Sequence, residues 1–387
     1  MTMPETREAT EITGGASGVF AIQQLRAAVA EGWVASDKYV IPRANLQPAS
    51  LDLRLGEQAH RLQCSFIPGD ATVEEKLRDY VMGSPIDLRD GAVLERQRPY
   101  LIPLMEGLRL PPNVRARTNP KSSTGRVDVF TRVITDRGHY FDDIADGYDG
   151  RLYLEVFSRS FTIRVETGLS LNQLRLVRGD PTLDDQELAG VHQREPLLFN
   201  DGRPADLKAL TAGSGLLMSV RLTGDGPVAY RARKNSKLLD LSLERHYELD
   251  DFWEEERPSG KQPRLVLEPE EFYLLVSKER IRVPAAYAAE MVAYDPTSGE
   301  LRTHYAGFFD PGFGDHPEMG EQGSRAVLEV RAHDVPFVIE DGQKVCKLAF
   351  QPMSEVPEVL YGAGLGSHYQ GQDLNLGKQF RMPGANP

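Results

Sequence analysis

The chain has 387 residues, more than one ordinary domain, and its 57 acidic against 45 basic residues give a net charge of -12. This balance lacks the basic footprint of proteins that bind duplex nucleic acid or an anionic membrane surface. Only two cysteines occur, Cys64 and Cys346, in no metal-ligand spacing, which favours a reducing cytoplasm without disulfides or zinc. No apolar run approaches the roughly 18 residues of a membrane span. We therefore expect a cytoplasmic protein of two domains.

The pattern along the chain predicts a β-rich fold after a short helix. Residues 1–15 are acidic and polar, and we expect a disordered lead-in there. Residues 19–33 have apolar positions at helical spacing and a glycine, Gly32, where a helix would end. From Tyr39 onward, short alternating runs such as LDLRL and VDVFTRVIT are separated by Gly, Pro, Asp and Asn, which is typical of many short strands. The sequence thus predicts a mainly β fold, a barrel or jelly-roll.

Three sequence blocks occur twice in the same order, which indicates a tandem duplication. From it we predict a first copy at 1–182, an acidic, turn-rich linker at 183–207 and a second copy at 208–387. The second block matches without a gap at an offset of 173 residues (267 - 94). The block pairs are 50–62 with 238–249, 94–111 with 267–284, and 147–176, which contains the hairpin, with 311–350.

The stretch KSSTGR combines three hydroxyl groups, a glycine and two cations. Such a set can hold a phosphate chain by charge-assisted hydrogen bonds worth roughly 1.5–3 kcal/mol each. The alternative interpretation is a solvated turn. Its residues are Lys121, Ser122, Ser123, Thr124, Gly125 and Arg126.

The hairpin GYDGRLYLEVFS places a carboxylate in a predicted strand. Alternation puts Arg151, Tyr153 and Glu155 on one face and Leu152 and Leu154 on the other. A carboxylate between apolar neighbours is unusual in a strand and indicates a functional group. The alternative is a charge on a wet sheet face.

Together, these ordered motifs resemble the dCTP deaminase and dUTPase superfamily, and its deaminase branch more closely. IPRANLQPASLDLRLG (41–56) is similar to the family's P-x-S-x-D-x-R-L-G, and KSSTGR to its R-S-S-x-x-R phosphate loop. The hairpin, with LSLNQLRL (169–176), is similar to P-G-W-x-G-x-I-x-L-E-x-x-N. LYGAGLGSHYQGQ (360–372) resembles the C-terminal arm that folds over bound nucleotide. The resemblance implies two tandem dUTPase-like distorted β-barrel or jelly-roll domains with a few short helices.

The resemblance also implies roles for individual residues. Ser122 and Arg126 match the active-site serine and arginine, and Glu155 matches the catalytic glutamate. Lys121 replaces the loop's first arginine, keeping the charge but losing bidentate geometry. The further positions expected to contact nucleotide are Ser123, Thr124, Gly125, Tyr148, Tyr153, Tyr361, Tyr369 and Gln372.

The implied reaction is hydrolytic deamination of dCTP to dUTP and ammonia, which breaks a cyclic amidine C–N bond and feeds dUMP and dTTP synthesis. Glu155 would take a proton from the water that adds at C4, provided that burial raises its pKa from about 4.3 toward neutrality. The sequence lacks the P-C-x-x-C element of zinc deaminases. We therefore expect no zinc, Mg²⁺ only as the triphosphate's counter-ion, and dTTP as a possible feedback inhibitor.

The two copies depart from the family pattern in opposite ways. The first copy has Ala145 where the family has an aspartate that contacts the deoxyribose. The second copy keeps that aspartate as Asp310 and has Glu329 at the position of Glu155, but its loop reads YDPTSGE (294–300) and sets an anion where phosphates would lie. The second copy is thus either degenerate or a contributor of Asp310, Glu329 and the tail to shared sites.

Sites in this superfamily lie between the subunits of a trimer. We expect a homotrimer in which a ring of first copies stacks on a ring of second copies, six domains in all. Three sites would then lie in the first ring, with Glu155 favoured over Glu329 as the catalytic group.

Two other functions remain open. A dUTPase, or a bifunctional enzyme that also removes pyrophosphate, suits Tyr148 in the hairpin, although Ala145 and Glu155 argue against a simple dUTPase. A non-catalytic nucleotide-binding regulator is suggested by the altered loop of the second copy.

Overall fold

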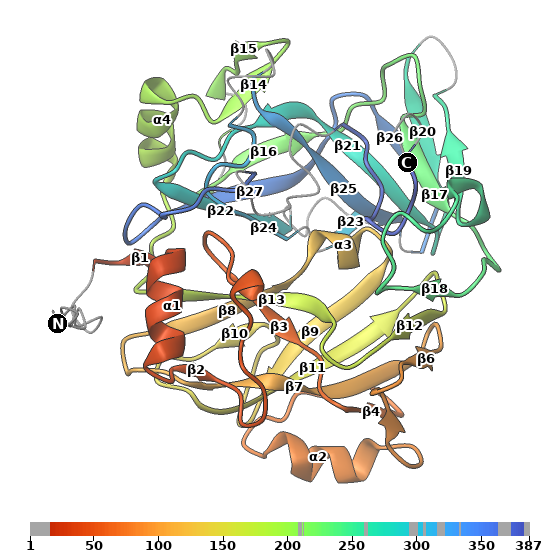
Figure 1. Cartoon of the computed structure of the whole chain (residues 1–387). Coiled ribbons are helices and arrows are strands. Elements are labelled where there is room, and N and C mark those ends of the chain that lie inside the picture. Colours follow the sequence, from red (N-terminus) through yellow and green to blue (C-terminus); the bar gives the residue numbers. More distant parts are fainter. Residues whose placement is uncertain are drawn as a thin grey trace, which may run out of the picture.

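The computed structural model describes most of the chain as two β-rich units, one above the other (Figure 1). The mainly β prediction is confirmed. None of the helices in the described part is long and apolar enough to cross a bilayer. The lead-in, the loop at 294–300, Tyr369 and Gln372 lie outside the described residues. Those residues are 16–207, 211, 213–258, 262–293, 301–304, 307–315, 322–332, 334–362 and 373–382.

The first unit has two facing sheets and a small third sheet, which enclose a hydrophobic core. Alternate side chains of β11 point into this core. Leu152, Leu154 and Val156 point into this core, and Tyr153 packs on the outer side, as the sequence pattern predicted. One sheet contains β1 (Gly18–Val19), β13 (Ser170–Arg178), β8 (Arg115–Pro120), β10 (Asp143–Ile144) and β3 (Leu51–Arg54). The facing sheet contains β5 (Ile86–Asp87), β4 (Gln58–Arg61), β7 (Pro99–Arg109), β11 (Asp149–Ser158), β9 (Val129–Thr135) and β2 (Val34–Ala35).

Short helices sit at the edges of these sheets. α1 (Ile22–Ala30) confirms the predicted N-terminal helix, and it ends before Gly32, whose φ of +78° suits glycine. α2 (Val73–Tyr80) begins with a capping box between Thr72 and Glu75. α3 (Ser122–Gly125) is a single turn formed by the predicted phosphate loop.

The second unit repeats the two-sheet plan. One sheet contains β15 (Arg203–Pro204), β14 (Leu198–Asn200), β21 (Phe272–Ile281), β17 (Ala229–Ala232), β19 (Trp253–Glu256), β25 (Ser324–Ala332) and β23 (Leu301–His304). The other contains β16 (Leu216–Ser219), β27 (Lys344–Pro352), β22 (Tyr287–Ala293) and β24 (Phe308–Phe309), and β20 (Arg264–Leu267) pairs with β26 (Phe337–Glu340).

The segment 183–207 is not an extended linker. It contains α4 (Asp185–Arg194), capped by Asp184, and the strands β14 and β15. β14 pairs with β21, and Leu188 and Val191 of α4 pack in the second hydrophobic core. This segment therefore belongs to the second unit.

The duplication is confirmed by equivalent buried glutamates at the predicted offset of 173 residues (279 - 106). Glu106 on β7 accepts the backbone N–H of Arg54 at 2.7 Å, and Glu279 on β21 accepts that of Ser219 at 2.8 Å. This contact makes β16 the counterpart of β3. The predicted match of Asp52 with Asp240 is therefore wrong.

Asp240 belongs instead to a strand that joins the two units. β18 (Leu239–Asp240) pairs in parallel with β12 (Ile163–Val165), which also pairs with β6 (Ala92–Leu94). Second-copy side chains such as Trp253, Leu274 and Phe380 complete the hydrophobic core of the first unit. The copies are thus interlocked rather than independent, and α3 lies at their junction (Figure 1).

Candidate active site at the junction of the two copies

The predicted phosphate loop forms a tight turn between β8 and β9. Lys121 precedes it with an extended backbone, and the N–H groups of Gly125 and Arg126 donate to the carbonyls of Lys121 and Ser122, both at 3.0 Å. Ser123, Thr124 and Gly125 are buried, whereas Ser122 is half-buried. The turn therefore projects from the first unit toward the second.

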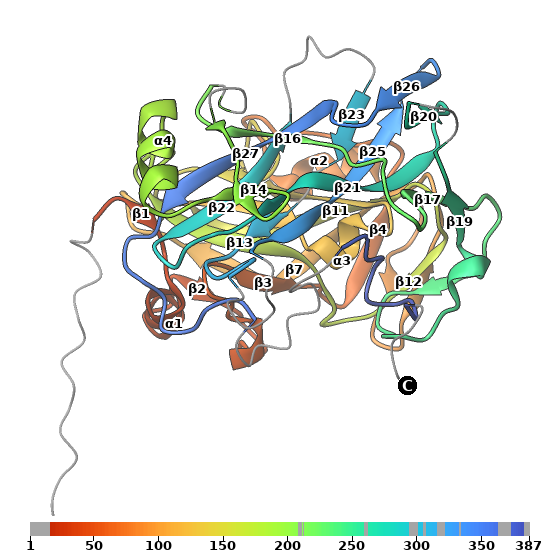
Figure 2. The ribbon, with the colours of Figure 1, turned by 90° about the horizontal axis from the view of Figure 1, so that it is seen from above.

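The second copy brings a glutamate directly against this turn. Glu329 lies on β25, between Leu274 of β21 and His304 of β23. A Cβ atom placed on Gly125 would lie 2.3 Å from Oε2 of Glu329, far inside contact distance. A side chain at this position would force the carboxylate or the turn to shift. Figure 2 shows β25 lying over the turn when the molecule is viewed from above.

Burial gives this carboxylate unusual electrostatics. Glu329 is 3% exposed, and burial raises its pKa well above the ordinary value. The positive charge of Arg126 lowers the pKa and offsets part of that effect, while the charge of Asp128 adds to it. A buried carboxyl group whose pKa is raised is suited to general acid and base chemistry.

The C-terminal segment covers Arg126. The Arg126 guanidinium, 4% exposed, donates from Nη1 to the carbonyl of Asn375 at 2.8 Å. Leu374 and Leu376, on either side of Asn375, are buried in the core of the first unit. The chain that follows the predicted nucleotide-covering tail thus closes over the turn.

Asp310 is held in the same region by a first-copy residue. Arg175, completely buried on β13, donates to the Asp310 carboxylate at 3.0 Å and to the carbonyls of Ala289 and Phe309. Its guanidinium also lies 4.0 Å from the ring centroid of Phe308. Asp310 therefore has a fixed position in the junction.

Lys121 does not carry a free charge, because its ammonium group pairs with the carboxylate of Asp52 on β3. Burial raises the pKa of Asp52, and Lys121 lowers it. The second copy approaches again at Gly307, where an added Cβ would lie 3.6 Å from the Ser122 hydroxyl and 2.9 Å from the carbonyl of Pro120. Ser122 therefore borders both copies.

Glu155 does not lie beside the turn in this chain. It faces Leu101 of β7 and Arg132 of β9 on the outer side of its sheet. Arg132 donates to its Oε1 from Nε at 3.2 Å, and a second contact comes from Nη2. Figure 1 shows α2 on that side of the unit and α3 at the opposite end, in the junction.

Apolar side chains seal the face that carries Glu155. Leu62, Phe66 and Val73 pack against Leu101 and Tyr153. The side chain of Glu155 is 2% exposed beneath them. The chain itself thus covers the surface on which a neighbouring loop would have to dock.

The predicted tyrosines have separate positions. The Tyr148 hydroxyl donates to the carbonyl of Arg151 at 2.6 Å and stabilises the hairpin turn. The Tyr153 hydroxyl lies 3.4 Å from Glu74 of α2, and burial raises the pKa of Tyr153 to about 12. Tyr361 packs on Phe313, with ring centroids 5.6 Å apart, after the turn that follows Asp310. Tyr148 and Tyr153 therefore support the first unit rather than the junction.

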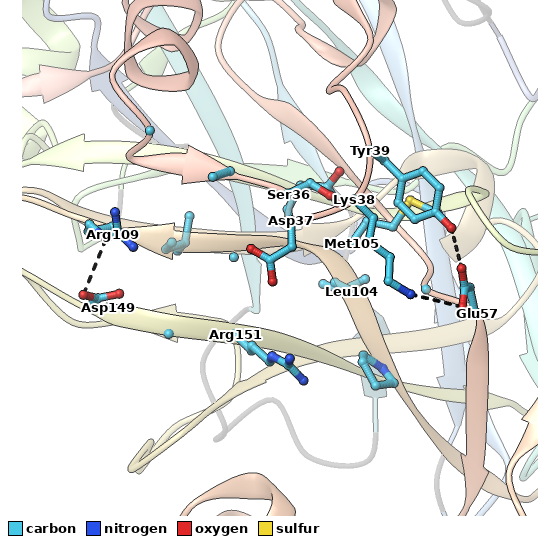
Figure 3. A pocket seen from close by; sticks show the side chains of 18 of the residues that line it. Ser36, Asp37, Lys38, Tyr39, Glu57, Leu104, Met105, Arg109, Asp149 and Arg151 are labelled. Carbon is cyan, nitrogen blue, oxygen red and sulfur yellow. Dashed lines mark hydrogen bonds and ion pairs between the residues drawn. The ribbon is translucent and has the colours of Figure 1, made fainter.

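A cavity of about 450 Å³ opens elsewhere, beside β2 and the end of β7 (Figure 3). Several of its charges are paired: Lys38 and Tyr39 both contact Glu57, and Arg109 lies 3.7 Å from Asp149. This mixed and largely satisfied lining offers no concentrated charge for a triphosphate. Among the described residues, no group of three His, Cys, Asp or Glu side chains is arranged for a metal ion.

Sequence reasoning missed the groups that hold the site together. Asn375 contributes only its carbonyl, which any residue would supply, so the sequence carries no signal for it. Arg175 alternates with apolar residues in a predicted strand, and that pattern was a usable signal of a buried charge. Asp52 stood in the recognised motif, but its partner Lys121 follows only from the folded structure.

The two interlocked copies match known proteins over most of the chain. Residues 16–180 match the family model described as the 2'-deoxycytidine 5'-triphosphate deaminase (DCD) N-terminal domain, and residues 184–380 match the corresponding C-terminal domain. The chain therefore belongs to the dCTP deaminase family.

Individual relatives share this family. A solved structure, 2'-deoxycytidine 5'-triphosphate deaminase from Agrobacterium tumefaciens, is 44% identical, with a TM-score of 0.83 over 90% of this chain and 99% of that one. The "dCTP deaminase, dUMP-forming" of Corynebacterium efficiens is 36% identical over 28% of this chain and 53% of that protein. The "dCTP deaminase" of Ignicoccus hospitalis is 26% identical over 37% of this chain and 75% of that protein. The match thus spans about half the length of the Corynebacterium relative.

Proposed function

We propose that this chain deaminates dCTP hydrolytically at a site built from both copies, with Glu329 as the general acid and base. The observation that carries the proposal is the contact of the Glu329 carboxylate with Gly125, beside Arg126. This assignment replaces Glu155, which pairs with Arg132 under α2. One chain then carries a complete pair of loop and glutamate.

The chemistry follows from the state of Glu329. The ionised carboxylate takes a proton from the water that adds at C4 of the cytosine ring. The carboxyl group delivers this proton to N3. It then takes the proton of the new C4 hydroxyl and passes it to the amino group, so that ammonia leaves as the C4 carbonyl forms. A pKa raised by burial suits both steps near neutral pH. Arg126 orients the carboxylate, and Ser122 holds the water or the ring edge.

The substrate is the magnesium complex of dCTP. Mg²⁺ enters with the triphosphate, and the chemistry assigns no step to zinc. The hydroxyl groups of the turn, Ser122 to Thr124, and the charge of Arg126 are the protein's contribution to phosphate binding. Asp310, fixed by Arg175, matches the position of the family's sugar-contacting aspartate. The cytoplasmic location, the dTTP feedback and the homotrimer stay predictions.

The site is compatible with two final products, dUTP and dUMP. The sequence predicted dUTP, with a bifunctional enzyme as the alternative. The Corynebacterium relatives are named as dUMP-forming, which favours the alternative, in which dUTP loses pyrophosphate and dUMP is released. Buried carboxylates near the turn, Asp52 and Asp310, are candidates to activate the second water. We therefore propose dUMP as the final product.

Product analysis tests both parts. The purified full chain is incubated with Mg²⁺ and either dCTP or dUTP, and chromatography separates dCTP, dUTP and dUMP. We expect dUMP from both substrates with the wild type and loss of deamination in Glu329→Gln. Accumulation of dUTP would keep the deaminase and remove the second step. Binding of dCTP without turnover would instead support a nucleotide-binding regulator.

A further inference from the structure

A second pair of opposite charges crosses the junction next to the pair formed by Arg126 and Glu329. Asp128 and Arg331 face each other with side chains 0% and 5% exposed, and their ion pair joins the first copy to the second. Asp128 follows Arg126 by two residues, and Arg331 follows Glu329 by two on the same face of β25. The first copy therefore presents a cation and then an anion, and the second copy presents the reverse order.

This second pair is fixed from several sides. Ser160 donates its hydroxyl to Oδ2 of Asp128 at 2.6 Å, and Arg331 lies 3.2 Å from the same hydroxyl. Arg331 also donates to the carbonyl of Glu270. Asp128 has a φ of +57°, in the left-handed region where glycine is preferred. The backbone thus accepts a strained residue at a position where the carboxylate meets Arg331.

We propose that Asp128 and Arg331 are positioning residues that lock β25 in register with the turn and so set the separation of Glu329 from Arg126. This inference rests on the proposed function and extends it. A buried ion pair is a weak source of stability compared with an apolar pair of the same shape. It does, however, impose a fixed geometry, because a slip of β25 by one step would bury both charges without partners. The reacting carboxylate of Glu329 requires a fixed register of β25 relative to the turn.

The decisive experiment removes both charges together. Asp128→Asn with Arg331→Gln keeps a polar side chain at both positions, and loss of both charges leaves no uncompensated ion in the junction. We expect kcat for dCTP deamination to fall about 100-fold, since small misplacements of catalytic groups have effects of this size. KM should stay within about threefold, because the phosphate-binding turn is untouched. A kcat within threefold of the wild type would overturn the proposal.

The pH profile separates positioning from a structural role. The charge of Asp128 raises the pKa of Glu329, so its removal lowers that pKa. The acid limb of the kcat profile, which reports ionisation of the base, should move to lower pH in Asp128→Asn alone, because the double variant also removes the positive charge of Arg331, which acts on the pKa of Glu329 in the opposite sense. A limb that stays in place while kcat falls would mean a structural defect and would count against the proposal.

Two further variants serve as controls for this experiment. Arg159→Gln removes another ion pair across the same junction, Arg159 with Glu270 at 2.6 Å, whose carboxylate is 61% exposed. It should leave kcat within twofold. Arg331→Lys keeps charge and fold but loses the fork geometry, and about a tenfold loss of kcat is expected. If the double variant fails to fold, full activity in Arg331→Lys would still refute the proposal, whereas activity in Glu329→Gln would refute the proposed function instead.

Discussion

Glu155 and Glu329 occupy equivalent strands of the two copies but opposite environments. Each faces the equivalent leucine of its partner strand, Leu101 or Leu274, at the duplication offset of 173 (274 - 101). Glu329 looks across the junction to the turn of the other copy, whereas Glu155 looks at α2 and Arg132 of its own copy. The pair shows how two copies of one strand can place the same carboxylate against its own unit in one case and against the other copy in the second.

Two features account for the difference. Above Glu155, the space is filled by α2 and the residues before it. Above Glu329, the equivalent space is filled by the first copy. Arg132 supplies within the first copy the positive charge that Arg126 supplies across the junction. The face that carries Glu155 is covered by its own unit, whereas the face that carries Glu329 is covered by the turn of the other copy.

The largest effect is expected when each of the two glutamates is replaced separately by glutamine and the two variants are compared. Glu329→Gln should lower kcat for deamination about 1000-fold, since it removes the proton acceptor. Glu155→Gln should leave kcat within about threefold, because that carboxylate faces α2 rather than the turn. Steady-state kinetics with dCTP measure both variants. Equal losses in the two would mean that both copies carry active sites.

A smaller effect is expected from closing the gap at the turn. Gly125→Ala places a methyl group 2.3 Å from Oε2 of Glu329, so the carboxylate or the turn must shift. We expect kcat to fall about 100-fold. Gly226→Ala is the matched control, because nothing lies within 4 Å of its added Cβ. If Gly125→Ala retains full activity, Glu329 does not act from the position described.

On the sealed face the expected effect is on stability rather than activity. Arg132→Leu leaves Glu155 buried without its cationic partner and should lower the free energy of unfolding by about 3 kcal/mol. The double variant Arg132→Leu with Glu155→Leu should recover most of that loss, since both charges are gone. Urea unfolding measures the free energies, and kcat should be unchanged in each. A loss of kcat in Arg132→Leu would place this face in the active site.

The sequence predicted local features well because local patterns encode them. The helix before Gly32 and the strand alternation around Leu154 follow from spacing and residue type. The gapless match of 94–111 with 267–284 also placed β7 and β21 correctly. Each of these features depends on residues close in the chain or on a long identical pattern.

The choice between the two glutamates could not be predicted, because it depends on docking between distant segments. No short pattern states that Gly125 meets Glu329 or that α2 covers Glu155. The match of Asp52 with Asp240 failed for a related reason: the pattern L-D-L is common, and only the pairing of strands distinguishes β16 from β18. Long-range packing decided both cases.

The smallest expected effect concerns Asp142, which reports on the sealed side of the first copy. It accepts hydrogen bonds from Thr118 at 2.6 Å and from the N–H of Val133 at 2.8 Å, yet burial raises its pKa to about 7. Because this pKa exceeds that of the unfolded chain, about 3.9, its contribution to stability is full below pH 4 and is lost as pH rises through 7.

Asp142→Asn should therefore remove a fall of about 2 kcal/mol in the free energy of unfolding between pH 5 and pH 8. Urea unfolding at the two pH values measures the difference, with the exposed neighbour changed in Asp143→Asn as control. The charge of Arg132 lowers the pKa of Asp142, so the fall should be larger in an Arg132→Leu background. An identical slope in wild type and Asp142→Asn would show that this carboxyl ionises normally. The sealed face would then be more open to water than its packing indicates.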